Sequence, residues 1–109
     1  MTISYEDFEK VDIRIGKILK AEDFPEARKP AYKLTIDFGA LGIKMSSAQI
    51  TNYKKEELAG KQVIAVVNFP KKQIAGFMSE VLTLGVPDKE GKIILLRPDK
   101  DVELGARMF

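Results

Sequence analysis

Apolar and polar residues alternate along three stretches in the first half of this chain. Residues 11–21, VDIRIGKILKA, alternate until Gly16 interrupts the run, where a bulge or a sharp bend would fit. Residues 32–39, YKLTIDFG, alternate in the same way, and residues 42–48, GIKMSSA, follow after the turn-like GALG. The pattern predicts three strands, of which the first is bent.

Two short helices are predicted from capping signals. Ser4 precedes Asp7 by three positions, which is the spacing of a capping box, so a helix should begin near the N-terminus. In residues 52–60, NYKKEELAG, Asn52 is the expected N-cap and Gly60 stands just beyond the expected end. The second helix therefore separates the first three strands from the rest of the chain.

Strand-like runs continue after the second predicted helix. Residues 61–69, KQVIAVVNF, are the most β-branched run, residues 77–85, FMSEVLTLG, alternate weakly, and residues 92–98, KIILLRP, follow the turn-like PDKEGK. Three strands, a helix and further strands are the order of an OB-fold, a small Greek-key barrel. The sequence therefore predicts the all-β class: a five-stranded OB-fold barrel with a short helix between strands three and four, plus N- and C-terminal extensions. With 109 residues, one domain spanning residues 1–109 is expected.

The absence of two residue types limits the catalytic and metal sites that the chain can form. The chain has no histidine and no cysteine, which excludes Cys/His zinc sites, Ser-His-Asp triads and thiol nucleophiles. None of its eight glycines falls into a phosphate-binding motif, and its carboxylates mostly alternate with lysines, which is typical of solvated faces. We therefore expect a protein that is not an enzyme and uses no cofactor or metal.

The expected location is the cytoplasm. No apolar run reaches the roughly 20 residues that span a bilayer, so membrane insertion is not expected. The start of the chain, MTISYEDFEK, is acidic, whereas a signal peptide begins with basic and then apolar residues.

Positive charge is concentrated in the middle of the chain. Between residues 44 and 72 there are six lysines and two glutamates, which gives this segment a net charge of +4, whereas the whole chain carries +2. Such a segment attracts phosphate backbones in a salt-sensitive way, but on charge alone a solvated lysine surface is the favoured interpretation. The candidate RNA-binding residues lie in this segment and in the loops that flank an OB-fold groove: Arg28, Lys29, Lys44, Asn68, Lys71, Lys72 and Ser79.

Apolar residues lie beside the lysines in residues 68–82, NFPKKQIAGFMSEVL. By the order of elements this is the loop between strands four and five, which flanks the ligand groove of an OB-fold together with residues 22–31. Apolar side chains around a glycine-containing loop predict an exposed interaction patch, and methionine makes such a patch adaptable. For any one of these residues, filling the end of the barrel or a dimer seam is the more common role, whereas the set together favours the patch. The candidate peptide-binding residues are Met45, Phe69, Ile74, Phe77 and Met78.

Several motifs, in sequence order, resemble one known family. DIRIGKI at 12–18, KLTIDFG at 33–39, EELAGK at 56–61 and VVNFPKKQIAGFMSE at 66–80 resemble the tRNA-binding domain appended to some bacterial methionyl- and phenylalanyl-tRNA synthetases. FPEARKPAYKLTIDFG, IKMSSAQIT and KQVIAVVNFPKKQIAGFMSEVL are similar to the stand-alone CsaA branch of that family, described as export-related chaperones. The resemblance covers most of the chain.

The resemblance implies an OB-fold homodimer and two classes of ligand. The chain ends help to form such a dimer, and the apolar residues Leu104, Met108 and Phe109 near the C-terminus are the expected interface residues. Lys71, Lys72 and Ser79 match the general pattern of the tRNA binders, which implies a phosphate-binding role for them. Lys29 is followed by proline and alanine where those domains commonly have a lysine-leucine pair, which argues against the same contacts there.

The function predicted on this basis is that of a molecular chaperone. It would bind unfolded or pre-export polypeptides through apolar pockets of a homodimer, with the export machinery as a possible further partner. The alternative is a tRNA-binding protein that recognises the tRNA backbone in the OB-fold groove. Aromatic and methionine side chains with few cations favour peptide, whereas a continuous cationic track with stacking faces favours nucleic acid.

Overall fold

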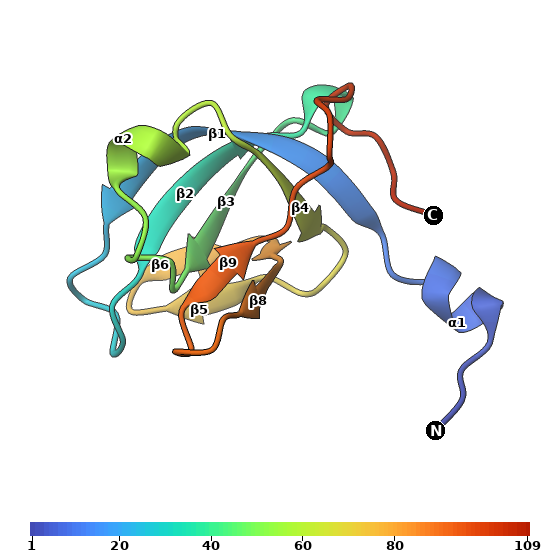
Figure 1. The fold of residues 1–109 in the computed structure, drawn as a ribbon, viewed down its shortest axis with the longest axis horizontal. Helices are drawn as coiled ribbons and strands as arrows, with labels where there is room; N and C mark the ends of the chain where they lie inside the picture. The colour runs from blue at the N-terminus through green and yellow to red at the C-terminus, as the bar shows by residue number, and fades with distance from the viewer.

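The main sheet curls into a nearly closed antiparallel barrel (Figure 1), seen in a computed structural model that describes all 109 residues. Its strands follow the order β3-β2-β1-β4-β7. They are β1 (Ile13–Asp23), β2 (Tyr32–Asp37), β3 (Ile43–Ala48), β4 (Gln62–Val66) and β7 (Leu82–Thr83). This arrangement confirms the predicted all-β class and is consistent with an OB-like barrel.

Two ribbons and three short helices complete the chain. The ribbons pair β5 (Lys72–Ile74) with β6 (Phe77–Ser79) and β8 (Gly85–Pro87) with β9 (Ile93–Leu95). The helices are α1 (Tyr5–Glu9), the 3₁₀ turn η1 (Gly39–Leu41) and α2 (Lys55–Leu58). Helix α1 stands away from the barrel and buries no residue, and its predicted capping box is confirmed by the reciprocal hydrogen bonds of Ser4 and Asp7 (Figure 1). No helix of the structure is long and apolar enough to cross a membrane.

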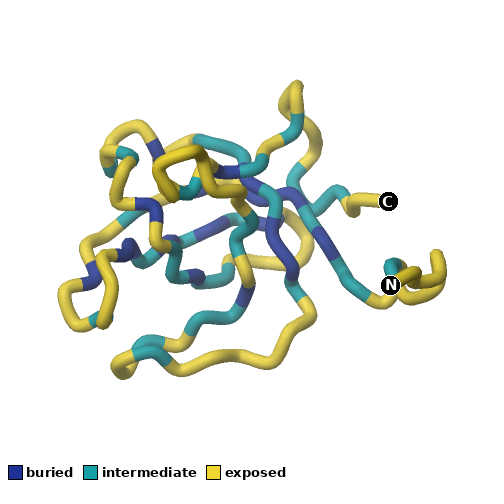
Figure 2. Tube along the Cα trace, turned by 60° about the horizontal axis from the view of Figure 1, so that its bottom comes forward, coloured by how far each residue is buried: buried dark blue, intermediate teal, exposed yellow.

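The core lies inside the barrel and follows the alternation of the sequence (Figure 2). On β2, residues 32, 34 and 36 are buried and the residues between them are half-buried, because successive side chains of a strand point to opposite faces. Gly16 faces the same core, and a Cβ at this position would lie 2.5 Å from Ile36 Cγ2 and 2.7 Å from Phe38 Cε1. Strand β1 therefore needs a glycine where it crosses the core.

The barrel closes between β3 and β7 with few backbone hydrogen bonds. Ser46, the one polar residue that is fully buried, hydrogen-bonds the Val81 carbonyl at 3.1 Å and the Thr83 hydroxyl at 2.8 Å. The Glu80 N–H donates to the Met45 carbonyl at 2.8 Å. Side chains thus complete the contact that a regular strand ladder would otherwise make.

Two predictions about local structure were wrong. Of the bulge or sharp bend expected at Gly16, the bulge is wrong: the ladder is regular at Gly16, and the register shift lies between Ile18 and Lys20. The predicted N-cap Asn52 lies before the helix, and its side chain donates to the Ile93 carbonyl at 3.2 Å. The actual N-cap is Lys54, whose N–H donates to Glu57 Oε1 at 3.0 Å.

The start of α2 is attached to the end of β1. Lys55 Nζ lies 2.9 Å from Asp23 Oδ2, and this hydrogen bond and ion pair raise the pKa of the Lys55 ammonium. Both side chains are well exposed, so the contact positions the helix more than it stabilises the protein.

The prediction of a single strand over residues 77–85 was also wrong. It consists of three short segments, β6, β7 and the start of β8, each paired with a different strand. Residues predicted as the loop before it form β5 instead. The weak alternation of this stretch reflects the changes of partner, since each pairing presents a different face to the core.

Candidate functional site

The β5–β6 hairpin is built around a two-residue turn. Ala75 and Gly76 both have positive φ, at 47° and 83°, as the tight hairpin turn that matches strand twist requires. The register pairs Ile74 with Phe77, Gln73 with Met78 and Lys72 with Ser79. Neighbours on a strand alternate between faces, so Phe77 and Met78 lie on opposite faces of the hairpin.

The Phe77 face of the hairpin packs against the loop that joins β1 to β2. The Phe77 ring meets the buried ring of Phe24 edge-on, with centroids 5.4 Å apart. The Lys33 ammonium stands 4.9 Å from the Phe24 centroid and 5.5 Å from the Phe77 centroid. These contacts hold together the two loops that flank the outer face of β2 and β3.

An apolar groove of about 230 Å³ lies at the base of the hairpin. Its apolar walls are Phe69, which is 50% exposed, Leu82, which is 47% exposed, and Pro70 and Val81. Its polar lining consists of Lys72, Ser79 and Glu80. Half-exposed large apolar side chains that border one hollow are a common feature of interaction surfaces.

Most of the polar groups of the groove are already paired within the chain. Glu80 accepts a hydrogen bond from the Met45 N–H at 2.9 Å, and its other oxygen lies 3.5 Å from Lys71 Nζ. The Ser79 hydroxyl accepts from the Ser47 N–H at 3.2 Å. The hairpin is thereby fastened to the edge of β3, and the positive charge of Lys71 is balanced by Glu80.

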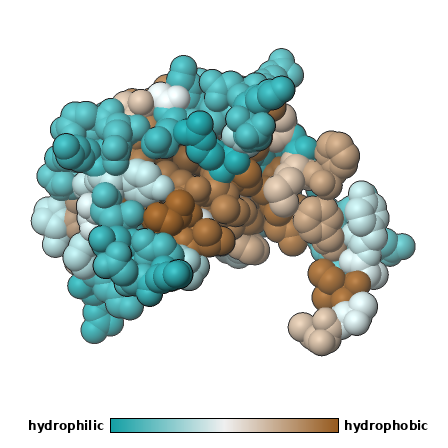
Figure 3. Space-filling view, in the orientation of Figure 1, coloured by the Kyte–Doolittle hydropathy of each residue, from teal (hydrophilic) through white to brown (hydrophobic).

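An apolar row runs across the outer face of the barrel and ends at this groove. Register pairs Ile13 with Val66 and Val66 with Leu82, so these three side chains share one face, opposite to the face of Gly16. Residues 105–108, here called the C-terminal tail, pair with β1, and Met108 N–H donates to the Ile13 carbonyl at 2.8 Å. We call Met108, Ile13, Val66 and Leu82 the outer row; Ile13 and Val66 are buried within it, and Met108 and Leu82 are exposed at its two ends. Figure 3 shows apolar surface gathered over β9 and β4, with hydrophilic atoms over α2.

Most of the chain matches one known protein family. Residues 13–107 match the family described as "Putative tRNA binding domain". The chain belongs to the tRNA-binding domain family. The matched residues take in the whole barrel, both ribbons and most of the C-terminal tail.

Two relatives of known structure are named as CsaA chaperones. The CsaA chaperone protein from Picrophilus torridus is 58% identical, with a TM-score of 0.94, over 99% of this chain and 100% of that one. The chaperone CsaA from Bacillus anthracis is 50% identical, also with a TM-score of 0.94, over all of both chains. The resemblance read from the sequence is confirmed, and both the tRNA-binding domain and the CsaA chaperones are non-catalytic families.

A curated relative shows the same domain inside a larger protein. Methionine–tRNA ligase from Methanocaldococcus jannaschii is 38% identical over 106 residues, which are 97% of this chain and 16% of the relative. The chain thus spans about one sixth of the length of the ligase that it matches.

The five predicted peptide-binding residues lie in different surroundings in the structure. Phe69 lines the groove, and Met78, 43% exposed, lies on the outward face of the hairpin. Phe77 and Ile74 are half-buried on the face toward the barrel. Met45 stands opposite Thr35 on the outer face of β3, and the Thr35 hydroxyl lies 3.5 Å from its sulfur. The five side chains surround the hairpin and do not line one pocket.

The predicted RNA-binding residues divide into exposed cations and structural groups. Arg28 and Lys29 are exposed in the loop before β2, Lys44 is half-buried on β3, and Lys72 is exposed at the groove. Lys71 is paired with Glu80. Asn68 accepts from the Asp12 N–H at 2.9 Å and donates to the Lys10 carbonyl at 2.8 Å, which accounts for both ends of its side chain. Ser79 fastens the hairpin to β3.

Sequence reasoning missed Leu82, Val81 and Glu80 as groove residues. Their position depends on how residues 77–85 divide between partners, and the alternation of a stretch gives no sign of such a division. Lys33 and Phe24 were also missed as a unit. The sequence instead predicted Arg28 and Lys29, two adjacent basic residues in the loop that also holds Phe24.

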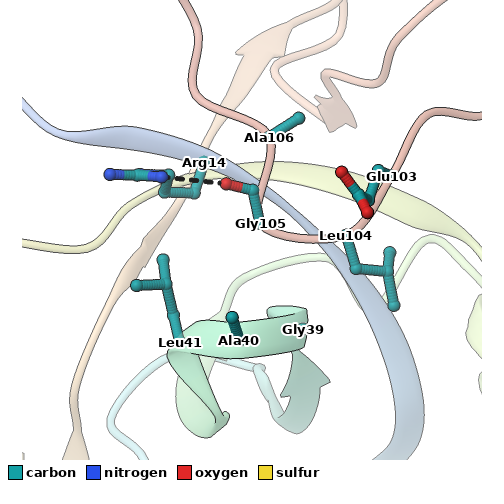
Figure 4. A pocket seen from close by; sticks show the side chains of 8 residues that line it. All are labelled: Arg14, Gly39, Ala40, Leu41, Glu103, Leu104, Gly105 and Ala106. Carbon is teal, nitrogen blue, oxygen red and sulfur yellow. Dashed lines mark hydrogen bonds between the residues drawn. The ribbon is translucent and has the colours of Figure 1, made fainter.

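A second hollow of about 410 Å³ lies between η1 and the C-terminal tail (Figure 4). Arg14 reaches it, but its guanidinium already donates to the Gly105 carbonyl at 3.0 Å and to Asp12 Oδ1 at 2.6 Å. The predicted interface residue Leu104 lines it and packs against Gly39 of its own chain. Although this hollow is larger than the groove, the one cation that lines it is already bonded within the chain, which makes it the weaker candidate for a ligand site.

Proposed function

We propose that this chain is a non-catalytic chaperone that holds extended apolar segments of unfolded polypeptides in the groove at the base of the β5–β6 hairpin. The observation that carries the proposal is the apolar groove between half-exposed Phe69 and Leu82, in a chain similar over its whole length to two CsaA chaperones. Met78 and Met45 extend the contact surface around the hairpin.

The size of the groove sets the expected strength of binding. A volume of about 230 Å³ accepts one or two large apolar side chains. Burying one such side chain is worth about 1.5–3 kcal/mol, from which the ordering of the client must be subtracted. Binding at each groove is therefore weak, and a chaperone of this kind benefits from presenting two grooves to one client.

The proposal includes a homodimer in which residues 1–109 act as one domain. Its interface is the Met108 end of the outer row together with Phe109, which is 97% exposed. Leu104 is the third proposed interface residue; it is half-buried and also lines the hollow between η1 and the C-terminal tail. Clients would be precursor polypeptides held in the cytoplasm before export, as the CsaA resemblance implies, with the export machinery as a further partner.

The test is suppression of aggregation of a chemically unfolded protein diluted from denaturant. In the double variant Phe69→Ser, Leu82→Ser, client binding should weaken at least about tenfold and protection should be lost, because each change removes a side chain that a client would bury. The matched control is Val86→Ser with Ile94→Ser, which removes two exposed, paired apolar side chains of the β8–β9 ribbon. If the first variant keeps the circular dichroism of the parent and still protects the client fully, the proposal is wrong.

Binding of tRNA is the second candidate function, and the outer face of β1 and β2 favours it. Lys17, Lys20 and Lys33 lie on this face, next to Arg28 and Lys29 in the adjoining loop. These side chains form the cationic surface that a phosphate backbone requires. The same face carries Glu22, which pairs with Lys20 at 3.6 Å, and this pair weakens the cationic surface.

A further inference from the structure

The groove holds one polar group that the chain leaves without a partner, the ammonium of Lys72. Glu80 and Ser79, the other polar residues of the lining, bond to Lys71 and to the backbone of β3. The Lys72 ammonium takes part in no hydrogen bond and no ion pair within the chain, and the residue stands opposite Ser79 in the hairpin register. Because Lys71 and Glu80 balance each other, Lys72 gives the groove a positive charge.

This combination of apolar walls and one spare cation defines the chemistry of the occupant. RNA binding of comparable strength needs a track of cations and several stacking faces, and this groove offers one cation and one aromatic ring. An apolar side chain beside a carboxylate satisfies both the walls and the ammonium. The lining therefore favours a polypeptide segment over a nucleic acid.

We propose that the groove selects client segments in which an apolar anchor residue lies close to Asp or Glu. The anchor fills the space between Phe69 and Leu82, and the carboxylate accepts a hydrogen bond from Lys72. In an extended segment, residues two positions apart lie on the same side and are separated by roughly 7 Å, a distance that a lysine side chain spans. The acidic residue is therefore expected two positions from the anchor. This inference rests on the proposed chaperone function and names the class of segment that it recognises.

The test uses two blocked, fluorescently labelled peptides with the same Phe anchor. One has Asp and the other has Lys at the two positions that lie two residues from the anchor on either side. Anisotropy titrations of the full chain should give an affinity for the Asp peptide up to about fivefold higher, the range of one partly exposed ion pair. Lys72→Glu should reverse the preference. Lys89→Glu is the control, because it changes the net charge equally at an exposed lysine of the β8–β9 turn and should leave the preference intact.

The outcomes separate this inference from the proposed function. Equal affinities for the two peptides, or a preference that survives Lys72→Glu, overturn the inference while aggregation suppression by the parent still supports the chaperone. If the parent protein neither binds the two peptides nor suppresses aggregation, both the inference and the proposed chaperone function are wrong. If neither peptide binds but a single-stranded RNA does, and Lys72→Glu abolishes that binding, the spare cation serves RNA and the inference is wrong.

Discussion

Gly16 and Asn52 show how single residues acquire roles that their type alone does not specify. Glycine in a strand indicates either a bulge or a close approach, and only the core side chains of Ile36 and Phe38 decide that Gly16 is the second case. Asn52 is a good helix cap by type, but its side chain is engaged by the Ile93 carbonyl of a distant ribbon. In both cases the deciding partner comes from another part of the chain.

A substitution at Gly16 should therefore be costly. Gly16→Ala places a methyl group 2.5 Å from Ile36 Cγ2 inside a packed core, and we expect it to lower the free energy of unfolding by about 1–3 kcal/mol. Urea denaturation followed by circular dichroism measures this directly. Lys17→Ala, at the exposed neighbouring position, is the control and should change stability by less than about 0.5 kcal/mol. A Gly16→Ala protein as stable as the parent would show that the core yields at this position.

At the scale of elements, the sequence predicted the strands in which apolar and polar residues alternate regularly. The first three strands and the order of a barrel follow from period-two patterns in residues 11–48, and the structure has them. Residues 77–85 could not be predicted in the same way, because three short pairings share one apolar run. The candidate site depends on this division. Phe69 and the lysines were predicted from the composition of their loop and the order of elements, whereas Leu82 and Glu80 were identified only from the strand register.

The C-terminal tail carries the prediction that belongs to this scale. Its backbone pairs with β1, while Phe109 and Met108 stay exposed by 97% and 39%, so the two side chains can be changed without removing the pairing. If they form a two-fold interface, Met108→Ser with Phe109→Ser should convert a dimer to a folded monomer in sedimentation equilibrium. Val86→Ser should leave the dimer unchanged. A dimer that persists in the tail variant would place the interface elsewhere.

At the scale of the whole molecule, the apolar groove and the cationic outer face are separate surfaces held together by one hairpin. The groove lies at the hairpin base, whereas Lys33 of the cationic outer face contacts Phe24 and Phe77, and Phe77 stands next to the hairpin turn. Apolar contacts are little affected by salt, whereas phosphate contacts weaken steeply with it. The two candidate functions therefore differ most in their response to ionic strength.

The central claim is tested most directly by titrating the protein with a chemically unfolded, reduced and alkylated client and with bulk tRNA, each at low and at high salt. The account predicts that affinity for the client stays within about twofold between the two salt concentrations. Any affinity for tRNA should decrease as the salt concentration rises. A plot of log affinity against log salt concentration should have a slope of about −0.7 to −0.9 for each phosphate neutralised. Client binding that disappears at high salt together with tRNA binding would contradict an apolar groove as the binding site.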